Sequence, residues 1–317
     1  MGNFNDSKLQ IMGKVLITGA SGLVGTRLTE VLLLNQFEVA HLGRSKRPSK
    51  VPSFLWDVNH QQMDPKSLEG VGAIVHLAGA GIADKRWNTA RKKEILDSRV
   101  HSTRLLYTSL KNNAHQIKVV VAASAIGYYG FGLSDQEFRE EDAPANDFLA
   151  EVTRQWEDEI DQIEKLGIRV VKIRIGIVLS NRGGALIEIS KPIRLGFGAT
   201  LATGLQIISW IHLDDLCEMF LKAINDYRMI GAYNGVAPNP VSNKKLTEAI
   251  AQVFQKRLWL PSVPSFVLRL VVGEMAQIVV NGCKVSSHKI LSTGFTFKFP
   301  IIEEALMDLF EGQSYKR

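Results

Sequence analysis

Cysteine is scarce in this chain. The two cysteines, Cys217 and Cys283, lie far apart and belong to no CxxC pair or Cys/His cluster. A disulfide framework needs a repeated set of cysteines, and a structural zinc site needs clustered ligands. We therefore expect neither.

Long apolar runs are lacking too. No stretch approaches the roughly 18–20 apolar residues that cross a bilayer, and the most apolar one, 266–272, is interrupted by Arg269. The first twelve residues lack the apolar core of a secretory signal, so we interpret them as a disordered extension, with Met12 as an alternative start. The sequence predicts a cytoplasmic protein without a membrane partner.

A strong excess of one charge is absent as well. Lys and Arg total 38 against 32 for Asp and Glu, and the resulting net charge of +6 is spread along the chain. A nucleic-acid-binding protein would more often concentrate its basic residues on one element, so we expect no nucleic-acid partner. The hydrophobic content of 45% is ordinary for a folded core and excludes a disordered or collagen-like chain.

What is present is an alternation of strand and helix patterns. Short β-branched runs alternate with longer segments of helical spacing up to about residue 180. The expected strands are 14–18, 37–41, 54–56, 73–77, 118–122 and 169–174, and the expected helices are 26–36, 89–112 and 148–165. This order predicts an α/β fold with a doubly wound parallel sheet, a Rossmann fold. Beyond residue 180 glycine and proline become frequent, which indicates a smaller C-terminal α/β lobe.

The first strand runs into a glycine-rich loop and then a helix. Gly19, Gly22 and Gly25 form GxxGxxG, and Ser21, Leu23 and Val24 stand between them. This spacing suits a tight turn, a close approach of backbone to a pyrophosphate, and close packing of helix on strand. The helix N-terminus adds free N–H groups and a partial positive charge. We assign these six residues to a dinucleotide, together with Leu77, Ala78 and Gly79, the small-residue end of the fourth strand.

The end of the second strand bears on the choice between NAD and NADP. An NAD site would place an acid there, whereas this sequence has Arg44, Lys46 and Arg47. Arginine binds a 2′-phosphate bidentately, which favours NADP(H) as cofactor; the alternative is a solvated basic turn. Asp57 and Val58 follow the third strand, where a carboxylate accepts from the adenine amino group or simply stabilises a turn.

These motifs carry a family resemblance. VLITGASGLVG, HLAGAGIADKRW, SRVHSTRLL, SAIGYYG and WIHLDDL resemble the extended short-chain dehydrogenase/reductase superfamily. ADKRW, GYYG and WIHLDDL are similar to its atypical branch of NAD(P)-binding epimerase-family proteins, commonly described as sugar-nucleotide epimerases. The resemblance covers residues 13–311.

The resemblance implies a domain division and further site residues. An NADP-binding domain would span 13–180, rejoined by 205–235, and a substrate lobe would span 181–204 and 236–317. Asp57 matches the adenine-side acid, and Ser98 falls on the helix that lines the cofactor cleft. His212, Asp214 and Asp215 match the returning segment, where we expect helix capping rather than a metal site. The long helices beside the fifth strand often pair in this superfamily, which makes a homodimer a candidate assembly.

One departure from the family concerns the chemistry. Members use a Tyr and, four residues later, a Lys on the helix after the fifth strand, because the Lys lowers the pKa of the Tyr. Here Phe148 and Val152 occupy those positions. The motif Tyr107–Lys111 matches the spacing, but it lies on the preceding helix, away from the expected cleft, and we interpret it as chance.

The remaining candidates follow the fifth strand. The family has a Ser or Thr after the fifth strand that hydrogen-bonds the substrate hydroxyl. Counting back four residues from Tyr128 places it at Ser124, and counting back four from Tyr129 places it at Ala125. Either tyrosine would serve as the proton-transfer group or merely line the pocket, and we assign Ser124 and Tyr128 as catalytic.

Two hypotheses for the function follow from these residues. The first is an NADP-dependent epimerase or oxidoreductase acting on a hydroxyl-bearing small molecule such as a nucleotide sugar. The second is an NADP(H)-binding module without turnover that regulates a partner.

Overall fold

The computed structural model describes residues 13–45, 51–132 and 136–310. The expected N-terminal extension and two of the three basic residues after the second strand, Lys46 and Arg47, lie outside these ranges.

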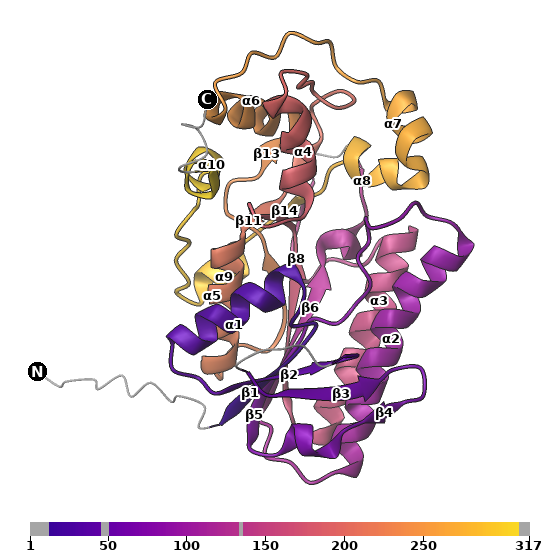
Figure 1. Ribbon diagram of the computed structural model, residues 1–317, viewed down its shortest axis with the longest axis vertical. Helices are drawn as coiled ribbons and strands as arrows, with labels where there is room; N and C mark the ends of the chain where they lie inside the picture. The colour runs from indigo at the N-terminus through magenta and orange to yellow at the C-terminus, as the bar shows by residue number, and fades with distance from the viewer. Residues whose placement is uncertain (1–12, 46–50, 133–135, 311–317) are drawn as a thin grey trace, which may run out of the picture.

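The core of the molecule is an eight-stranded sheet with the order β12-β8-β6-β5-β1-β2-β3-β4 (Figure 1). All its pairings are parallel except that of β4 with β3. The strands are β1 Lys14–Thr18, β2 Val39–Gly43, β3 Ser53–Asp57, β4 Gln62–Met63, β5 Val71–His76, β6 Val119–Ala125, β8 Arg169–Ile175 and β12 Gly231–Gly235. Most apolar residues of β1, β5 and β6 are inaccessible to solvent, as expected for a sheet covered on both faces.

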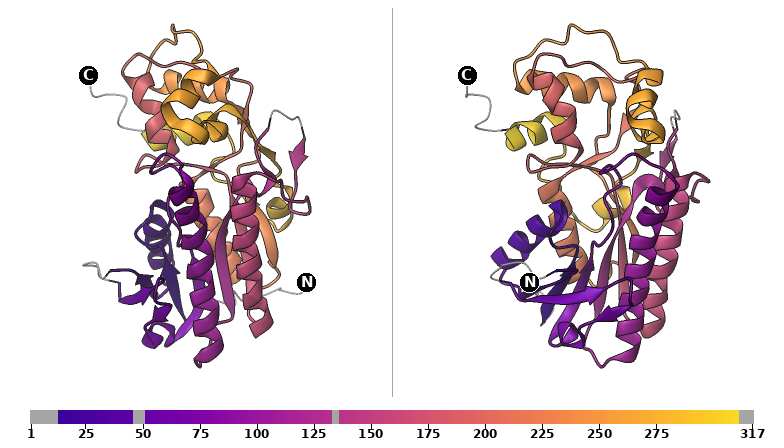
Figure 2. Two further views of the ribbon diagram at one scale, coloured as in Figure 1. Left: turned by 90° about the vertical axis from the view of Figure 1, so that its right-hand side faces the viewer. Right: turned by 45° about the vertical axis from the view of Figure 1, so that its right-hand side comes forward.

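Two helix layers cover the sheet (Figures 1 and 2). Helices α1 (Leu23–Leu34) and α5 (Leu213–Asn225) pack together on one face, and α2 (Thr89–Asn112) and α3 (Phe148–Asp161) pack together on the other. The predicted doubly wound parallel sheet is thereby confirmed. The chain leaves β1 toward β2 on one side and reaches β5 on the other. The carboxyl ends of β1 and β5 therefore form the switch point at which such sheets bind ligands.

A second group of elements stands beyond this carboxyl edge (Figure 2). It has its own core, in which Leu186, Ile193, Trp210, Leu246 and Phe310 are buried. Its elements are β7 Glu137–Phe138, β9 Ile177–Leu179, α4 Ala185–Arg194, β10 Ile207–Ile208, β11 Trp210–His212, β13 Val241–Ser242, α6 Asn243–Val253, α7 Ser265–Val272, α8 Ala276–Val280, β14 Lys284–Val285 and α10 Ile302–Phe310. Helix α9 His288–Ser292 instead packs on β12, and its Ile290 is buried in the main core. Four 3₁₀ turns complete the described structure: η1 Pro65–Leu68, η2 Ile126–Tyr129, η3 Gln162–Leu166 and η4 Gly273–Met275.

The chain returns from this group to the large sheet through α5 and β12, where β12 pairs with β8. The domain limits expected from the sequence, 13–180 with 205–235 against 181–204 with 236–317, stay predictions. None of the helices in the described ranges has the length and apolar character needed to span a bilayer.

Candidate cofactor and catalytic site

The glycine loop after β1 leaves room for a ligand's phosphates. Gly19 has a φ of 67°, and a Cβ there would lie 2.7 Å from the carbonyl of Leu77. A Cβ at Gly25 would lie 2.5 Å from the Gly19 oxygen, so helix α1 meets the loop only through glycine. Within the described chain, the N–H groups of Leu23 and Val24 have no acceptor. The loop fits a pyrophosphate.

The N-terminus of α1 also leaves backbone N–H groups available to an anion. Gly22, its N-cap residue, provides no side-chain cap, and its N–H donates to the Gly19 oxygen over 3.0 Å. Ser21 is exposed beside it. A helix that begins without a side-chain cap leaves its first N–H groups to an external anion.

The loop after β5 is tied to the end of β1. Thr18 Oγ1 accepts hydrogen bonds from the N–H groups of Leu77 and Ala78 over 3.1 and 3.2 Å. On the far side, Ser98 Oγ accepts from the Ala80 N–H over 3.0 Å. The residues predicted to contact the cofactor, Leu77 to Gly79, thus lie beside the glycine loop, and Ser98 holds their loop rather than lying free.

A buried histidine extends this tie into α2. His76 Nδ1 lies 2.8 Å from Thr18 Oγ1, and its Nε2 lies 3.0 Å from Thr103 Oγ1. Because the Thr103 hydroxyl donates to the Arg99 carbonyl over 2.8 Å, it accepts from Nε2–H, and Thr18 donates to Nδ1. Complete burial lowers the pKa of His76 to about 4, so the ring is neutral near pH 7.

Arg44 directly follows β2, as the sequence predicts. It is exposed and makes no ion pair or hydrogen bond with any residue that the structure describes. A hydrogen bond from Arg91, followed by the charges of Arg91, Lys85 and Arg44, lowers the pKa of Glu94. No acid of β2 lies there to accept from a ribose hydroxyl.

Asp57 closes its own turn. Its carboxylate accepts from the N–H groups of Asn59 and His60 over 2.9 and 3.0 Å and from the His60 ring over 2.8 Å. The hydrogen bonds of His60 lower the pKa of Asp57. Val58 packs partly buried against the main core. The turn role that the sequence left open is therefore present, and an adenine contact stays a prediction.

Ser124 lies inside β6, not after it, and is 3% exposed. Its Oγ donates to Glu157 Oε1 over 2.5 Å. Arg174 holds the same carboxylate with Nε and Nη2, over 2.8 and 2.9 Å. Burial alone would raise the pKa of Glu157, but the hydrogen bonds and charge of Arg174 outweigh it and lower that pKa.

The sequence analysis missed Glu157 and Arg174. The available signal was Arg174 itself, because an arginine at the end of a strand buried on both faces requires a counter-charge. Nothing in the sequence showed that Glu157 was the partner.

The two tyrosines of η2 have different surroundings. The Tyr129 hydroxyl donates to Asn234 Oδ1 over 2.7 Å and accepts from Arg174 Nη1 over 2.9 Å. Burial raises the pKa of Tyr129 above its ordinary value. Tyr128 is half-buried, with the Arg174 guanidinium 3.5 Å from its ring centroid, and its hydroxyl has no partner in the described part of the chain. Of these two tyrosines, Tyr128 is the one whose hydroxyl has no partner among the described residues.

Helix α3 offers no substitute at the family's Tyr and Lys positions. Phe148 packs edge-to-face on Trp87 with ring centroids 5.1 Å apart, and Val152 is buried in the same apolar cluster. Tyr107 and Lys111 occupy the last turns of α2, whose end leads to the N-terminal edge of β6. They lie at the opposite edge of the sheet from the glycine loop.

The WIHLDDL segment caps a helix. His212 Nδ1 accepts from the Asp214 N–H over 3.1 Å at the start of α5, and Asp214 pairs with Arg27 over 2.7 Å. Asp215 accepts from the N–H groups of Lys298 and Phe299 over 2.7 and 3.0 Å. The expected helix cap is thus made by His212, whereas Asp214 and Asp215 bind Arg27 and the 298–299 backbone instead. The described residues contain no group of three side chains arranged to hold a metal ion.

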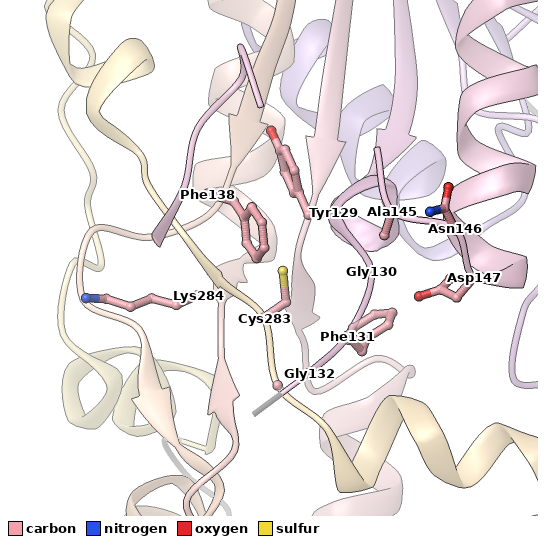
Figure 3. A pocket seen from close by; sticks show the side chains of 11 residues that line it. Tyr129, Gly130, Phe131, Gly132, Phe138, Ala145, Asn146, Asp147, Cys283 and Lys284 are labelled. Carbon is pink, nitrogen blue, oxygen red and sulfur yellow. The ribbon is translucent and has the colours of Figure 1, made fainter. Parts of the chain in front are cut away.

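A cavity of about 430 Å³ lies next to η2 (Figure 3). Figure 3 shows it between Tyr129–Gly132 and Asp147 on one side and Cys283 on the other, and Gly132 and Gly282 bridge these two sides by backbone hydrogen bonds. Burial raises the pKa of Cys283 to about 12, so it is a neutral thiol in an aromatic wall.

Comparison with known proteins agrees with this geometry. Residues 15–235 match the model of the NAD dependent epimerase/dehydratase family, and residues 263–309 match a domain of unknown function, DUF1731. The chain is 35% identical to the epimerase family protein SSP1921 of Staphylococcus saprophyticus over 301 residues, which cover 94% of this chain and 99% of that protein.

Two solved structures are similar throughout the chain. Human epimerase family protein SDR39U1, crystallised with NADPH, superposes with a TM-score of 0.86 at 30% identity and covers 94% of this chain and 99% of its own. A nucleoside-diphosphate sugar epimerase from Corynebacterium glutamicum superposes with a TM-score of 0.77 at 32% identity, with 94% of this chain matching 58% of that one. Glycine loop, sheet order and sequence identity agree, and the chain belongs to the NAD dependent epimerase/dehydratase family.

Proposed function

We propose that the protein binds NADP(H) at the carboxyl ends of β1 and β5 and uses it to oxidise or reduce a hydroxyl- or carbonyl-bearing small molecule. The observation that carries this proposal is Arg44, an exposed cation without a described partner, at the position where an NAD site would have an acid. NADPH in the human relative supports the same choice.

The residues that would hold the dinucleotide follow from the site. The N–H groups of Leu23 and Val24 face the phosphates across Gly19, Gly22 and Gly25, and Arg44 takes the 2′-phosphate. Ser21 stands beside the loop, and Leu77, Ala78 and Gly79 give a wall without bulky side chains. When bound, the nicotinamide supplies or accepts a hydride.

The proton must then move through a group of this chain. Tyr129 is occupied by Asn234 and Arg174, which leaves Tyr128 as the proton-transfer residue. The Ser124 proton is engaged by Glu157, so Ser124 would accept a hydrogen bond from a substrate hydroxyl rather than donate one. Transient oxidation followed by re-reduction gives epimerisation, and net transfer gives a reductase.

The cavity beside η2 is the proposed entry for the substrate, because aromatic walls and Asp147 suit a sugar ring bearing hydroxyl groups. A nucleotide-linked sugar is supported by the name of the Corynebacterium protein. We also propose a cytoplasmic location and a homodimer formed through α2 and α3.

The competing function is an NADP(H)-binding module without turnover, favoured by the apolar Phe148 and Val152 positions. Incubation of the protein with NADPH deuterated at C4 and a panel of ketoses, nucleotide sugars and their oxidised forms separates the two. Stereospecific loss of deuterium to a substrate supports the enzyme. Tight NADPH binding with no transfer to any compound supports the module.

A further inference from the structure

Arg99 of α2 is a buried cation without an acid partner. It is 9% exposed, and its Nη1 donates to the carbonyls of Ala80 and Ile95 over 3.1 and 2.9 Å. Its Cζ lies 5.1 Å from the ring centroid of Trp156. Among the described residues, none accepts from Nε or Nη2, so three of the five N–H groups of this guanidinium are unused. A buried charge without a counter-charge is costly and needs a reason.

Arg91, two turns earlier on α2, provides a comparison. It is also buried, and its Nη2 donates to the next loop carbonyl, that of Gly81. It differs in having acid partners, Glu94 at 2.7 Å and Asp84 at 3.5 Å. Both arginines donate to carbonyls of the loop after β5, so this role does not explain why Arg99, unlike Arg91, has no acid partner among the described residues. Burial, and then the charge of Arg91, lower the pKa of Arg99 to about 10, which still leaves it charged near pH 7.

The position of Arg99 relates it to the site. A Cβ at Gly79 would lie 3.2 Å from its Cζ and 3.4 Å from its Nε, so the guanidinium packs directly on the small-residue loop at the switch point. Its other neighbour, Trp156, precedes Glu157, which holds Ser124. The Arg99 guanidinium therefore lies between the loop after β5 and Trp156 of α3, and α2 and α3 stand side by side in Figure 2.

We propose that Arg99 is an oxyanion-binding residue, whose Nε and Nη2 pair with a carboxylate or phosphate group of the bound ligand. The Nε–Nη2 edge presents two parallel N–H groups, the arrangement that binds an oxyanion bidentately. This inference rests on the proposed function for the identity of the cleft. The oxyanion is either the acid group of the substrate, which makes the substrate class anionic, or the pyrophosphate of the dinucleotide.

The test compares Arg99→Met, Arg99→Lys and the control Arg91→Met, which removes the matched arginine of the same helix. Calorimetry at constant ionic strength measures the affinity of each protein for NADPH, and then that of the NADPH-saturated protein for acetate and for inorganic phosphate. Free protein is titrated with inorganic pyrophosphate in parallel, so that failure to bind NADPH, which would contradict the proposed function, leaves the Arg99 question answerable.

Arg99→Met should weaken the affected binding at least about tenfold, Arg99→Lys should weaken it less, and Arg91→Met should stay within about twofold of the parent protein. Loss of acetate or phosphate binding with NADPH affinity kept assigns the oxyanion to the substrate. Loss of NADPH and pyrophosphate binding assigns it to the cofactor. If Arg99→Met does not fold, Arg99→Lys, which keeps the charge but not the fork, should still weaken the binding about threefold. Equal effects of the Arg99 and Arg91 variants, or no change in any of these affinities, would overturn the proposal.

Discussion

Ser124 Oγ and Glu157 Oε1 are 2.5 Å apart, and this bond connects the candidate catalytic strand to a buried ion pair. Glu157 and Arg174 are both nearly inaccessible, at 4% exposure each. The pair fixes the hydroxyl of Ser124 toward α3 and sets the guanidinium of Arg174 over the ring of Tyr128. The geometry around both candidate catalytic residues therefore depends on one carboxylate.

Replacing the Glu157 carboxylate should destabilise the folded protein. Glu157→Gln should lower the free energy of unfolding by about 3 kcal/mol, because it leaves the buried charge of Arg174 uncompensated. Urea unfolding followed by circular dichroism measures it. Glu151→Gln, which disturbs an exposed pair with Arg154, is the control and should cost under about 1 kcal/mol. Equal losses in the two variants would show that the buried pair carries no special role.

The glycine loop gives a second prediction. Gly25→Ala should lower the affinity for NADPH at least about tenfold, because its Cβ would meet the Gly19 oxygen at 2.5 Å and displace the loop. Gly22→Ala, whose Cβ would lie 3.3 Å from the same oxygen, should be milder. Calorimetric titration of folded variants measures both. A Gly25→Ala protein with unchanged affinity would contradict the assignment of the loop.

His76 predicts how stability depends on pH. Its pKa is about 4 when folded and about 6.5 when unfolded, so the unfolded chain binds its proton first as the pH falls. The contribution of the neutral ring is complete above about pH 6.5 and is lost as the pH falls toward 4, up to about 3 kcal/mol. His76→Asn should flatten this part of the profile, whereas the exposed His288→Asn should not. Identical acid profiles for His76→Asn and the parent protein would contradict the buried neutral ring.

Much of the fold could be predicted from local pattern. Helix 89–112 has the predicted bounds, because the Asn88 cap and the apolar spacing are local signals. Strand β2 was expected at 37–41 but spans Val39–Gly43, because pairing of Val15 with Val39 fixes its register and Phe37 instead bonds back to Leu32 at the end of α1. The predicted helix 148–165 ends at Asp161 and continues as a 3₁₀ turn.

The residues of the candidate site likewise fall into those that local sequence predicts and those that depend on distant parts of the chain. The glycine loop is one short motif after β1 and Arg44 directly follows β2, so both could be predicted from local sequence. The partners of Ser124 and Tyr129 were not, because Glu157 and Asn234 lie 33 and 105 residues away and meet them only through packing of α3 and β12. Ser124 was expected after a strand ending at Ala122, whereas β6 continues through pairing of Ser124 with Arg174.

The chemistry gives a further prediction. Tyr128→Phe should abolish any turnover and leave NADPH binding unchanged. It removes the proposed proton-transfer hydroxyl, which has no partner among the described residues. Tyr107→Phe and Lys111→Ala, on the distant end of α2, are matched controls and should keep full activity. Steady-state rates on the substrate found by deuterium transfer decide it. Activity that survives Tyr128→Phe, or is lost beyond about tenfold in either control, would exclude this assignment.

The central claim is that Arg44 selects NADP(H), and calorimetric titration with NADPH and NADH tests it most directly. The unaltered protein should bind NADPH more tightly by about 1–3 kcal/mol, the contribution of a charge-assisted contact. Arg44→Ala should remove most of that difference, and Arg257→Ala, which removes an exposed arginine of the second group of elements, should keep it. Equal affinities of the unaltered protein for the two cofactors, or a preference that survives Arg44→Ala, would contradict the claim.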